Sequence, residues 1–315
     1  MPAATRRKTL GESKVKDMKI ALFSDVHGRL RIVLHLLRNW QMAHQTRLDC
    51  ALAAGDLGVF PDVAKMDKAT RRWIEADPEE AGFSRFFTRP QPTVERLFRS
   101  EHGPFSDVSC PIFFIPGNHE DYDFISTKAH TSAGQDTFAV DCYERFHCIR
   151  DGAIIRLRGQ DGRQLRIAGI WGIEKTVPHA PYRVNPATIE KLAALKENSF
   201  DLLLTHDAPG EAHPIGGSQA VAAVVKACKP KVHLFGHVHP VNGRHEYATP
   251  GVATKSVLLK GVSFGKRMDE SLVGAMGILN WDGTSADIEI VNDAWLHQMR
   301  AGNWEQICPE VTGEI

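Results

Sequence analysis

Short, continuous apolar runs recur along this 315-residue chain, and amphipathic segments separate several of them. Apolar runs of this length between turn residues are typical of buried strands. In the segment 29–45, apolar residues recur at the i, i+3, i+4 and i+7 spacing of one helix face, beginning at Leu30. With strands predicted at 18–23 and 48–54 on either side, this helix completes a β-α-β unit with parallel strands and a right-handed crossover.

The later part of the chain continues the alternation. Asn185 and Pro186 predict the start of a helix, because Asn is a favoured N-cap and proline a favoured first helical residue. The Asp161-Gly162 pair predicts a hairpin between strands at 154–158 and 165–170. A further helix is predicted around Val221, Val224, Val225 and Cys228. The remaining predicted strands are 112–115, 201–204, 231–235, 256–264, 272–280 and 286–291.

Residues 60–109 interrupt this rhythm. They are rich in Arg, Glu, Phe and Pro, with helical patterns around 62–76 and 92–101. We predict a helical insertion that overhangs the functional site. The chain as a whole is predicted to be an α/β protein of two packed sheets with helices outside, forming one domain over 18–293. A disordered segment, 1–17, would precede this domain, and a C-terminal tail, 294–315, would follow it.

Composition narrows the function only a little. Apolar residues make up 43% and charged residues 24%, as in an ordinary globular protein. Lys plus Arg equals Asp plus Glu at 38 each, so no overall charge attracts nucleic acid. A local basic patch in the insertion remains open, with a solvated helical face as the alternative. Its arginines are Arg71, Arg72, Arg85, Arg89, Arg96 and Arg99.

The cysteines and the hydropathy pattern bear on location. None of the six cysteines forms a C-x-x-C pair, and Cys50 and Cys110 lie beside predicted strands, where we expect core positions. We therefore expect no disulfide framework and a cytoplasmic, reducing location. No run approaches the ~20 apolar residues that span a bilayer, so no membrane partner is expected. The sequence does not specify an oligomeric state.

Five short polar segments each follow directly on a predicted strand. Seven of their side chains are candidate ligands, namely two carboxylates, four imidazoles and one amide oxygen, a mixture that suits Mn, Fe or Zn ions. Seven ligands are too many for one tetrahedral ion and suit two ions with a bridging carboxylate. Two such ions can hold the attacking and leaving oxygens of a displacement and make hydroxide available at neutral pH. The segments are Asp25-Val26-His27, Gly55-Asp56, Gly117-Asn118-His119-Glu120, Thr205-His206-Asp207 and Gly236-His237-Val238-His239.

In this order the segments resemble the signature of the calcineurin-like metallophosphoesterases: D-x-H, G-D, G-N-H-E, H and G-H-x-H. The resemblance spans about residues 19–240 and implies a four-layer α/β/β/α sandwich of two mixed sheets. It implies that the first metal ion is held by Asp25, His27 and His239. The second would be held by Asn118, His206 and His237. Asp56 would bridge the two ions, and His119 would contact the scissile phosphate and assist the leaving group without binding metal.

A narrower resemblance concerns the lariat-debranching subgroup of this family. The insertion and the segments 165–175 and 205–209 are similar to that subgroup. The debranching enzymes carry a cysteine where this chain has His27, which argues against RNA debranching as the activity.

Four loop residues near the motifs could grip a substrate phosphate: Lys175, Arg183, His213 and His245. The favoured function is a phosphodiesterase that cleaves a nucleotide or nucleic-acid bond through a metal-bound hydroxide. The first alternative is a phosphomonoesterase or phosphoprotein phosphatase, although the segment 55–60 lacks the G-D-x-V-D-R-G arginine motif expected of the latter. The second is a non-catalytic metal-binding scaffold, against which the presence of His119 argues.

Overall fold

The computed structural model describes residues 17–159, 162–174 and 179–309. Within them, one sheet contains seven strands in the order β13-β12-β1-β2-β3-β5-β4, and a second contains six in the order β10-β11-β9-β8-β7-β6. The first sheet is made of β1 Met18–Phe23, β2 Cys50–Ala54, β3 Ile112–Ile115, β4 Thr137–Ala139, β5 Phe146–Ile149, β12 Gly277–Trp281 and β13 Ala286–Ile290. The second is made of β6 Ile154–Arg158, β7 Gln164–Gly169, β8 Leu202–Leu204, β9 Val232–Phe235, β10 Glu246–Ala248 and β11 Lys255–Leu258.

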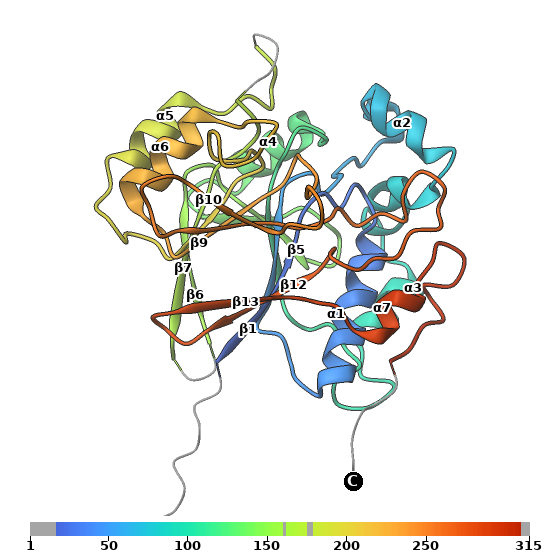
Figure 1. The fold of residues 1–315 in the computed structure, drawn as a ribbon. Coiled ribbons are helices and arrows are strands. Elements are labelled where there is room, and N and C mark those ends of the chain that lie inside the picture. Colours follow the sequence, from blue (N-terminus) through green and yellow to red (C-terminus); the bar gives the residue numbers. More distant parts are fainter. Residues whose placement is uncertain (1–16, 160–161, 175–178, 310–315) are drawn as a thin grey trace, which may run out of the picture.

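The helices cover the outer faces of both sheets, with α5 and α6 on one side and α1 and α7 on the other (Figure 1). The α-helices are α1 Leu30–His44, α2 Lys68–Ile74, α3 Pro92–Glu95, α4 Tyr122–Thr131, α5 Pro186–Ala193, α6 Gln219–Cys228 and α7 Ala294–Gln298. Short 3-10 helices are η1 Val63–Lys65, η2 Pro78–Ala81 and η4 Arg96–Phe98, and η3 Phe83–Phe87 is a π-helix.

The period-2 alternation of strand side chains builds three apolar layers. On β1, Ile20 and Leu22 pack against the second sheet, whereas Ala21 and Phe23 pack toward α1. On β8, Leu202 and Leu204 also belong to the layer between the sheets, and Leu203 packs with α5 and α6. The structure therefore confirms the four-layer α/β/β/α sandwich.

The strands that carry the polar segments run parallel to one another. In the first sheet β1, β2 and β3 pair in parallel, and in the second β8 pairs in parallel with β9. Parallel strands bring their carboxyl ends to the same edge of a sheet, where ligands of open α/β sheets gather. β11 also pairs in parallel with β9, so the segment that follows Leu258 reaches the same edge.

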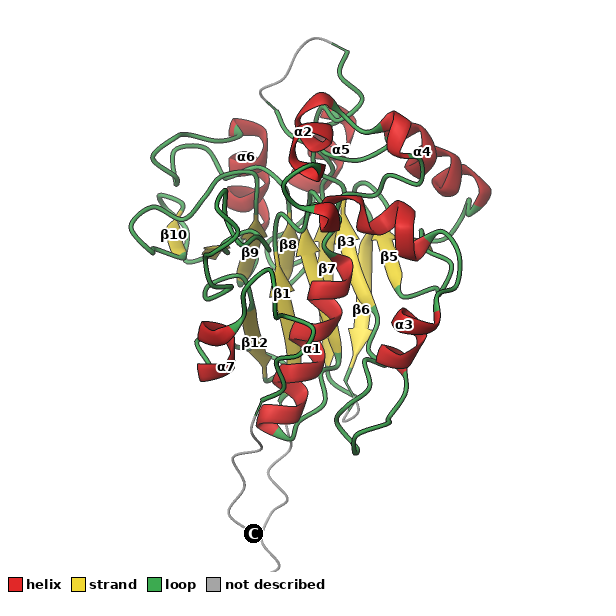
Figure 2. Ribbon diagram, turned by 90° about the vertical axis from the view of Figure 1, so that its right-hand side faces the viewer, coloured by secondary structure: helices red, strands yellow, loops and turns green. Residues whose placement is uncertain are grey.

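The predicted insertion is helical but composed of short pieces. Phe83, Phe87, Val94 and Leu97 enter the same apolar layer as α1. The earlier part, 60–81, instead packs around a small cluster of its own: Phe60, Met66 and Ala81, with Ile74 partly buried against them. In Figure 2 α2 lies above the ends of the strands.

Several elements were not predicted from the pattern. α4 carries only three buried residues among ten, so its helical face is faint, and β4 and β10 are only three residues long. α7 lies inside the segment predicted to be a tail, and its Trp295 and Leu296 pack into the apolar layer of α1. The predicted segment 1–17 lies outside the described residues up to position 16, as do hairpin positions 160 and 161.

No helix among the described residues is long and apolar enough to cross a membrane. All six cysteines are free, and Cys50 and Cys110 are buried as expected.

The layer between the sheets predicts a large cost for removing a core side chain. Ile167 on β7 is fully buried there, so Ile167→Ala should lower the free energy of unfolding by about 2–5 kcal/mol. Urea denaturation measures the difference. Ile215→Ala is the control, because Ile215 is 71% exposed and should change stability by less than about 0.5 kcal/mol. Equal stability of the two variants would contradict close packing between the sheets.

Candidate metal centre

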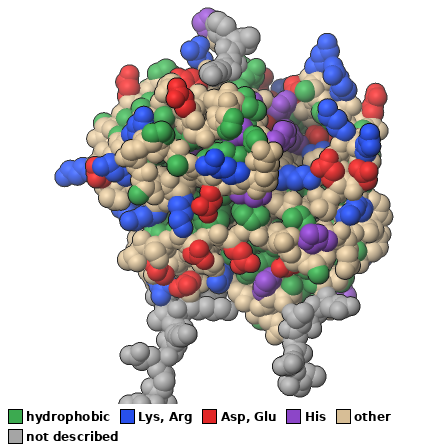
Figure 3. Space-filling view, viewed as in Figure 1, with side chains coloured by type: hydrophobic (Ala, Val, Ile, Leu, Met, Phe, Trp, Pro, Cys, Tyr) green, Lys and Arg blue, Asp and Glu red, His purple; other side chains and the backbone are tan. Residues whose placement is uncertain are grey.

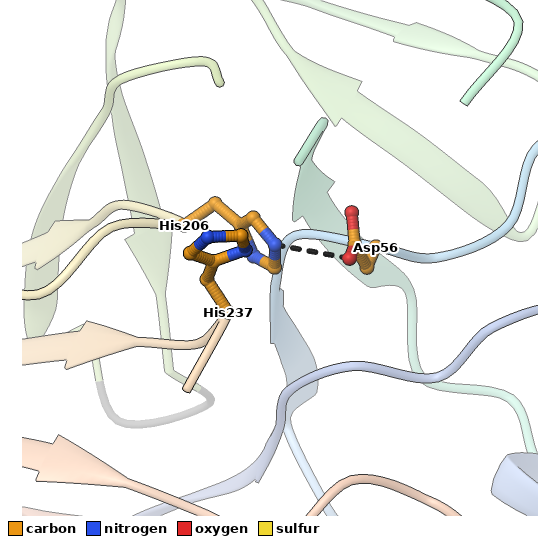
Figure 4. Close-up of side chains that lie close together, drawn as sticks. All are labelled: Asp56, His206 and His237. Carbon is orange, nitrogen blue, oxygen red and sulfur yellow. Dashed lines mark ion pairs between the residues drawn. The ribbon is translucent and has the colours of Figure 1, made fainter. Parts of the chain in front are cut away.

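The polar segments that follow β1, β2, β8 and β9 converge at one edge of the two sheets. Two groups of side chains bring their ligand atoms within 4.8 Å of one another: Asp25, His27 and Asp56 form one, and Asp56, His206 and His237 form the other. Asp56 is common to both. Figure 4 shows the second group, in which Asp56 from the first sheet faces two imidazoles from the second.

The two oxygens of the Asp56 carboxylate have different partners. Its Oδ1 accepts backbone N–H groups of Asn118 and His119, at 2.7 and 2.8 Å. Its Oδ2 lies 3.1 Å from Nε2 of His206 and 3.8 Å from Nε2 of His27. Although burial raises the pKa of Asp56, these histidines lower it more, so the carboxylate stays ionised. One oxygen thus fixes the loop after β3, and the other faces both groups.

Two buried polar atoms at this edge have no hydrogen-bond partner among the described residues: Oδ1 of Asn118 and Nε2 of His206. Nδ1 of His206 donates to the carbonyl of Ala54 at 2.9 Å, which directs Nε2 toward Oδ2 of Asp56. Burial lowers the pKa of His206, but the charge of Asp56 raises it to about 10, and a metal ion bound there would take the place of the Nε2 proton. Buried polar groups without partners are costly unless something else satisfies them. An amide oxygen, imidazoles and carboxylates are suitable ligands for divalent transition metals, so the residues present fit a metal centre.

The backbone at this edge is strained. Four residues of the two groups adopt left-handed φ angles although none is glycine: Asp25 at 49°, His27 at 48°, Asp56 at 48° and His237 at 68°. Such conformations cost on the order of 1–3 kcal/mol each and persist where the surrounding structure enforces them. They turn each chain sharply just after its strand, so that the side chains point along the sheet edge.

Two glycines permit the close approach of these segments. A Cβ on Gly117 would lie 2.2 Å from Oδ1 of Asp56, and one on Gly236 would lie 2.7 Å from Oδ2 of Asp25. No side chain fits at such distances. The glycines of the motifs therefore serve close packing at these two positions.

Glu120 holds the loops together from beneath. Its Oε1 accepts the N–H of Leu57 at 2.6 Å and of Gly58 at 3.4 Å, and its Oε2 accepts that of Gly117 at 2.9 Å. Burial and the nearby charge of Asp56 raise the pKa of Glu120 to about 8. The motif had singled out this residue without a role, and the structure shows that it joins the loops after β2 and β3.

His119 does not belong to either group. Its Nδ1 donates to Oδ2 of Asp67 at 2.8 Å, so the insertion contacts this histidine directly. Burial lowers the pKa of His119, but the hydrogen bond to Asp67 and the charges of Asp56 and Asp67 raise it to about 9. Sequence reasoning missed Asp67, because 52 residues separate it from its partner.

His239 lies outside both groups but lines the same cavity as Asp25 and His27. This cavity measures about 930 Å³ and extends between α2 on one side and the segment 260–273 on the other. Burial lowers the pKa of His27 to about 3, which keeps its imidazole neutral, as a metal ligand must be.

The four candidate phosphate-gripping residues have different positions. His245 lines the cavity, and its Nδ1 donates to the carbonyl of Leu258 at 2.8 Å, while its Nε2 makes no hydrogen bond with the described residues. His213 is only 1% exposed and donates from Nε2 to the carbonyl of His239 at 3.1 Å, so it supports that loop from behind. Arg183 is exposed and does not line the cavity. Lys175 lies outside the described residues.

Comparison with known proteins supports the interpretation as a metal centre. A family model described as calcineurin-like phosphoesterase matches residues 18–241. A search of curated proteins found none that matches.

Solved structures show weaker likenesses. The protein TT1561 of Thermus thermophilus is 16% identical, with a TM-score of 0.47 over 88% of this chain and 100% of that one. The Thermus thermophilus sulfate thiohydrolase SoxB is 12% identical, with a TM-score of 0.44 over 95% and 60% of the two chains. A 5'-nucleotidase from Candida albicans is 13% identical, with a TM-score of 0.38 over 84% and 47%. Because these TM-scores lie below 0.5, the family assignment depends on the family model.

Glu120 offers a test of how the centre is held. Glu120→Ala leaves three buried N–H groups without an acceptor, so the loops after β2 and β3 should loosen and Mn²⁺ affinity should fall by about 10–100-fold. Glu120→Gln keeps one acceptor oxygen, so its Mn²⁺ affinity should lie between those of Glu120→Ala and the wild type. Calorimetric Mn²⁺ titration measures all three, with circular dichroism to confirm folding. A folded Glu120→Ala protein with wild-type affinity would show that these hydrogen bonds do not support the centre.

Proposed function

The chain belongs to the calcineurin-like phosphoesterase family and is a metal-dependent phosphoester hydrolase, and from this premise we propose that it is a two-metal phosphodiesterase acting on a nucleotide or nucleic-acid bond. The observation that carries the proposal is the Asp56 carboxylate, shared by two groups of ligands that come from different sheets. The Oδ1 of Asn118, which is buried without a hydrogen-bond partner among the described residues, supports the same assignment.

The proposed ligands follow the two groups. Asp25, His27 and His239 would hold one ion, Asn118, His206 and His237 the other, and Asp56 both. When bound, Mn, Fe or Zn ions supply a water of lowered pKa and neutralise charge on the phosphate oxygens. Within the chain, Asp25 accepts the N–H of His237 through Oδ1 at 3.1 Å, so the ends of β1 and β9 are held together across the sheets.

His119 is the proposed catalytic residue. Its Nδ1 is occupied by Asp67, so Nε2 is the ring atom available to a substrate in the cavity that both His119 and Asp25 line. A protonated His119 can stabilise charge on the phosphate and give a proton to the departing oxygen. Asp67 would fix the orientation of the ring and favour its protonated form, as a positioning residue.

A diester fits the surroundings better than a protein-bound phosphate. From Asp25, His27 and His239 the cavity continues along α2 and along the segment 260–273, so both ester oxygens of a phosphate could carry a substituent. The insertion supplies one of these walls, and we propose that it selects the substrate. Phosphomonoesterase activity is the alternative.

The ligand assignment is tested by metal content and hydrolysis together. The Mn²⁺-reconstituted protein should bind two ions per chain and hydrolyse bis(p-nitrophenyl) phosphate. Asp56→Asn should reduce both more than any other single ligand substitution, because the bridging carboxylate serves both ions. Metal analysis and kcat are the measurements. A single tight site with no hydrolysis would overturn the two-metal proposal, and a nearly active Asp56→Asn variant with two ions would overturn the bridge.

The role of His119 is tested by its dependence on the leaving group. His119→Asn should keep both metal ions and lose about 10²–10⁴-fold in kcat for alkyl esters. The loss should be smaller for p-nitrophenyl esters, whose leaving group barely needs a proton. Loss of metal would make His119 a ligand, and equal losses for both esters would leave only electrostatic stabilisation.

Asp67→Asn is the matched variant for the positioning role, because Asn also caps a helix well but carries no charge. Like His119→Asn, it should lose more kcat for alkyl esters than for p-nitrophenyl esters, but both losses should be smaller. Combined with His119→Asn it should add little, since residues in one hydrogen-bonded unit are not additive. Full additivity would separate Asp67 from the action of His119.

A further inference from the structure

The cavity has two walls that contribute no metal ligand. α2 forms one, through Ala69, Thr70 and Trp73. The segment after β11 forms the other, and it includes Ser263, Lys266 and Arg267. Asp25, His27 and His239, the proposed ligands of one ion, line the cavity between these walls, so a long substrate centred on that ion would touch both.

Trp73 is an aromatic side chain that the core does not use. It is 37% exposed and belongs to none of the apolar clusters among the described residues, although its neighbour Ile74 packs against Phe60 and Met66. Its indole makes no hydrogen bond or ring contact in the described part of the chain. An aromatic ring on a cavity wall without packing partners is suited to stacking on a planar group of a ligand.

Two exposed cations line the wall opposite α2: Lys266 and Arg267. α2 exposes three more, Lys68, Arg71 and Arg72, which lie beside the cavity residues of that helix but do not line the cavity. Among the described residues none of the five forms an ion pair or hydrogen bond through its side chain. Exposed Glu75, Asp269 and Glu270 offset them only in part, and Glu270 is paired with Lys260. Figure 3 shows Lys and Arg side chains over α2, with His side chains beside them.

The wall opposite α2 is fixed with respect to the metal groups. The N–H of Val262 donates to the carbonyl of Asp25 at 3.1 Å. Lys260 closes the segment by donating to Oε2 of Glu270 at 2.8 Å and to the carbonyl of Ser271 at 2.9 Å. Lys266 and Arg267 therefore lie in a segment whose start is hydrogen-bonded to the proposed ligand Asp25 and whose two ends are joined through Lys260.

We infer that the cavity binds single-stranded nucleic acid across the metal centre, with a base stacked on Trp73 and phosphates of neighbouring nucleotides on Lys266 and Arg267. The inference rests on the proposed function, since it takes the scissile phosphate to lie at the metal groups. Stacking on a side chain needs a base that is free of the double helix, whereas basic walls alone would hold any polyanion. The combination of an indole on one wall with cations on the other selects an unpaired strand.

The test is the binding of a short fluorescein-labelled phosphorothioate oligothymidylate, which resists hydrolysis, to the Mn²⁺-loaded protein by fluorescence anisotropy. Trp73→Ala should weaken binding by roughly 5- to 150-fold, the range for losing one stacked base, and Trp73→Phe should restore part of it. Lys266→Ala with Arg267→Ala should lower the slope of log Kd against log salt by about 1.4, because each phosphate contact on a single strand contributes about 0.7.

Matched controls separate these effects from general charge. Arg156 and Arg158 are exposed on β6, away from α2 in Figures 1 and 2, so Arg156→Ala with Arg158→Ala removes the same charge and should leave Kd unchanged. An abasic strand keeps the phosphates but has no base, so Trp73→Ala should not weaken its binding further. A duplex of the same length should bind more weakly than the single strand.

Three results would overturn the inference: tight binding by Trp73→Ala, an equal effect of Trp73→Ala on the abasic strand, or a duplex bound as well as a single strand. Hydrolysis of bis(p-nitrophenyl) phosphate by the same preparation keeps the two proposals apart. If the wild type hydrolyses this ester but Trp73 and the two cations do not affect strand binding, this inference fails and the proposed function stands. If strand binding behaves as expected without hydrolysis, the proposed function fails alone.

Discussion

The carboxylate of Asp56 is the interaction on which the rest of the site depends. It leaves β2 in the first sheet, holds the loop after β3 through two backbone N–H groups and faces His206 from the second sheet. A buried carboxylate is tolerable only when its charge is compensated, and here two N–H groups and nearby imidazoles supply that compensation. One side chain thereby links the two sheets at the edge where the candidate metal ligands lie.

The architecture makes such a meeting possible. Each sheet brings parallel strands to the same edge, and residues in left-handed conformations, Asp25 and His237 among them, turn the chains there. Glu120 joins two of the resulting loops from below. The local strain is supported by a large apolar layer between the sheets, so that stability gained in the interior offsets conformations that only the site requires.

Much of the fold could be predicted from the sequence, because the ligand-bearing strands are continuous apolar runs and their ligands follow directly. β1, β3 and β6 have the predicted bounds, and the helix predicted over 29–45 is α1. The short edge strands and α4 carried too little periodicity. Within the site, the parallel strands predicted that the motif residues come together. They did not predict contacts between segments that are distant in the sequence. Nothing in the spacing links Asp67 to His119, and only tertiary packing determines that the polar loop residue His213 is buried behind His239.

Asp67 connects the insertion to the chemistry in a way that concerns dynamics. Its Oδ1 caps α2 through the N–H groups of Ala69 and Thr70, while its Oδ2 holds His119. α2 has only seven residues and rests on a small apolar cluster, so it belongs to the class of elements that open locally at low free energy. One such opening would free His119 and remove Trp73 from the cavity together, while the metal ligands stayed in place. The opened conformation would then be a reversible inactive state of the enzyme. The fraction of time spent in it would limit how often a bound substrate is cleaved.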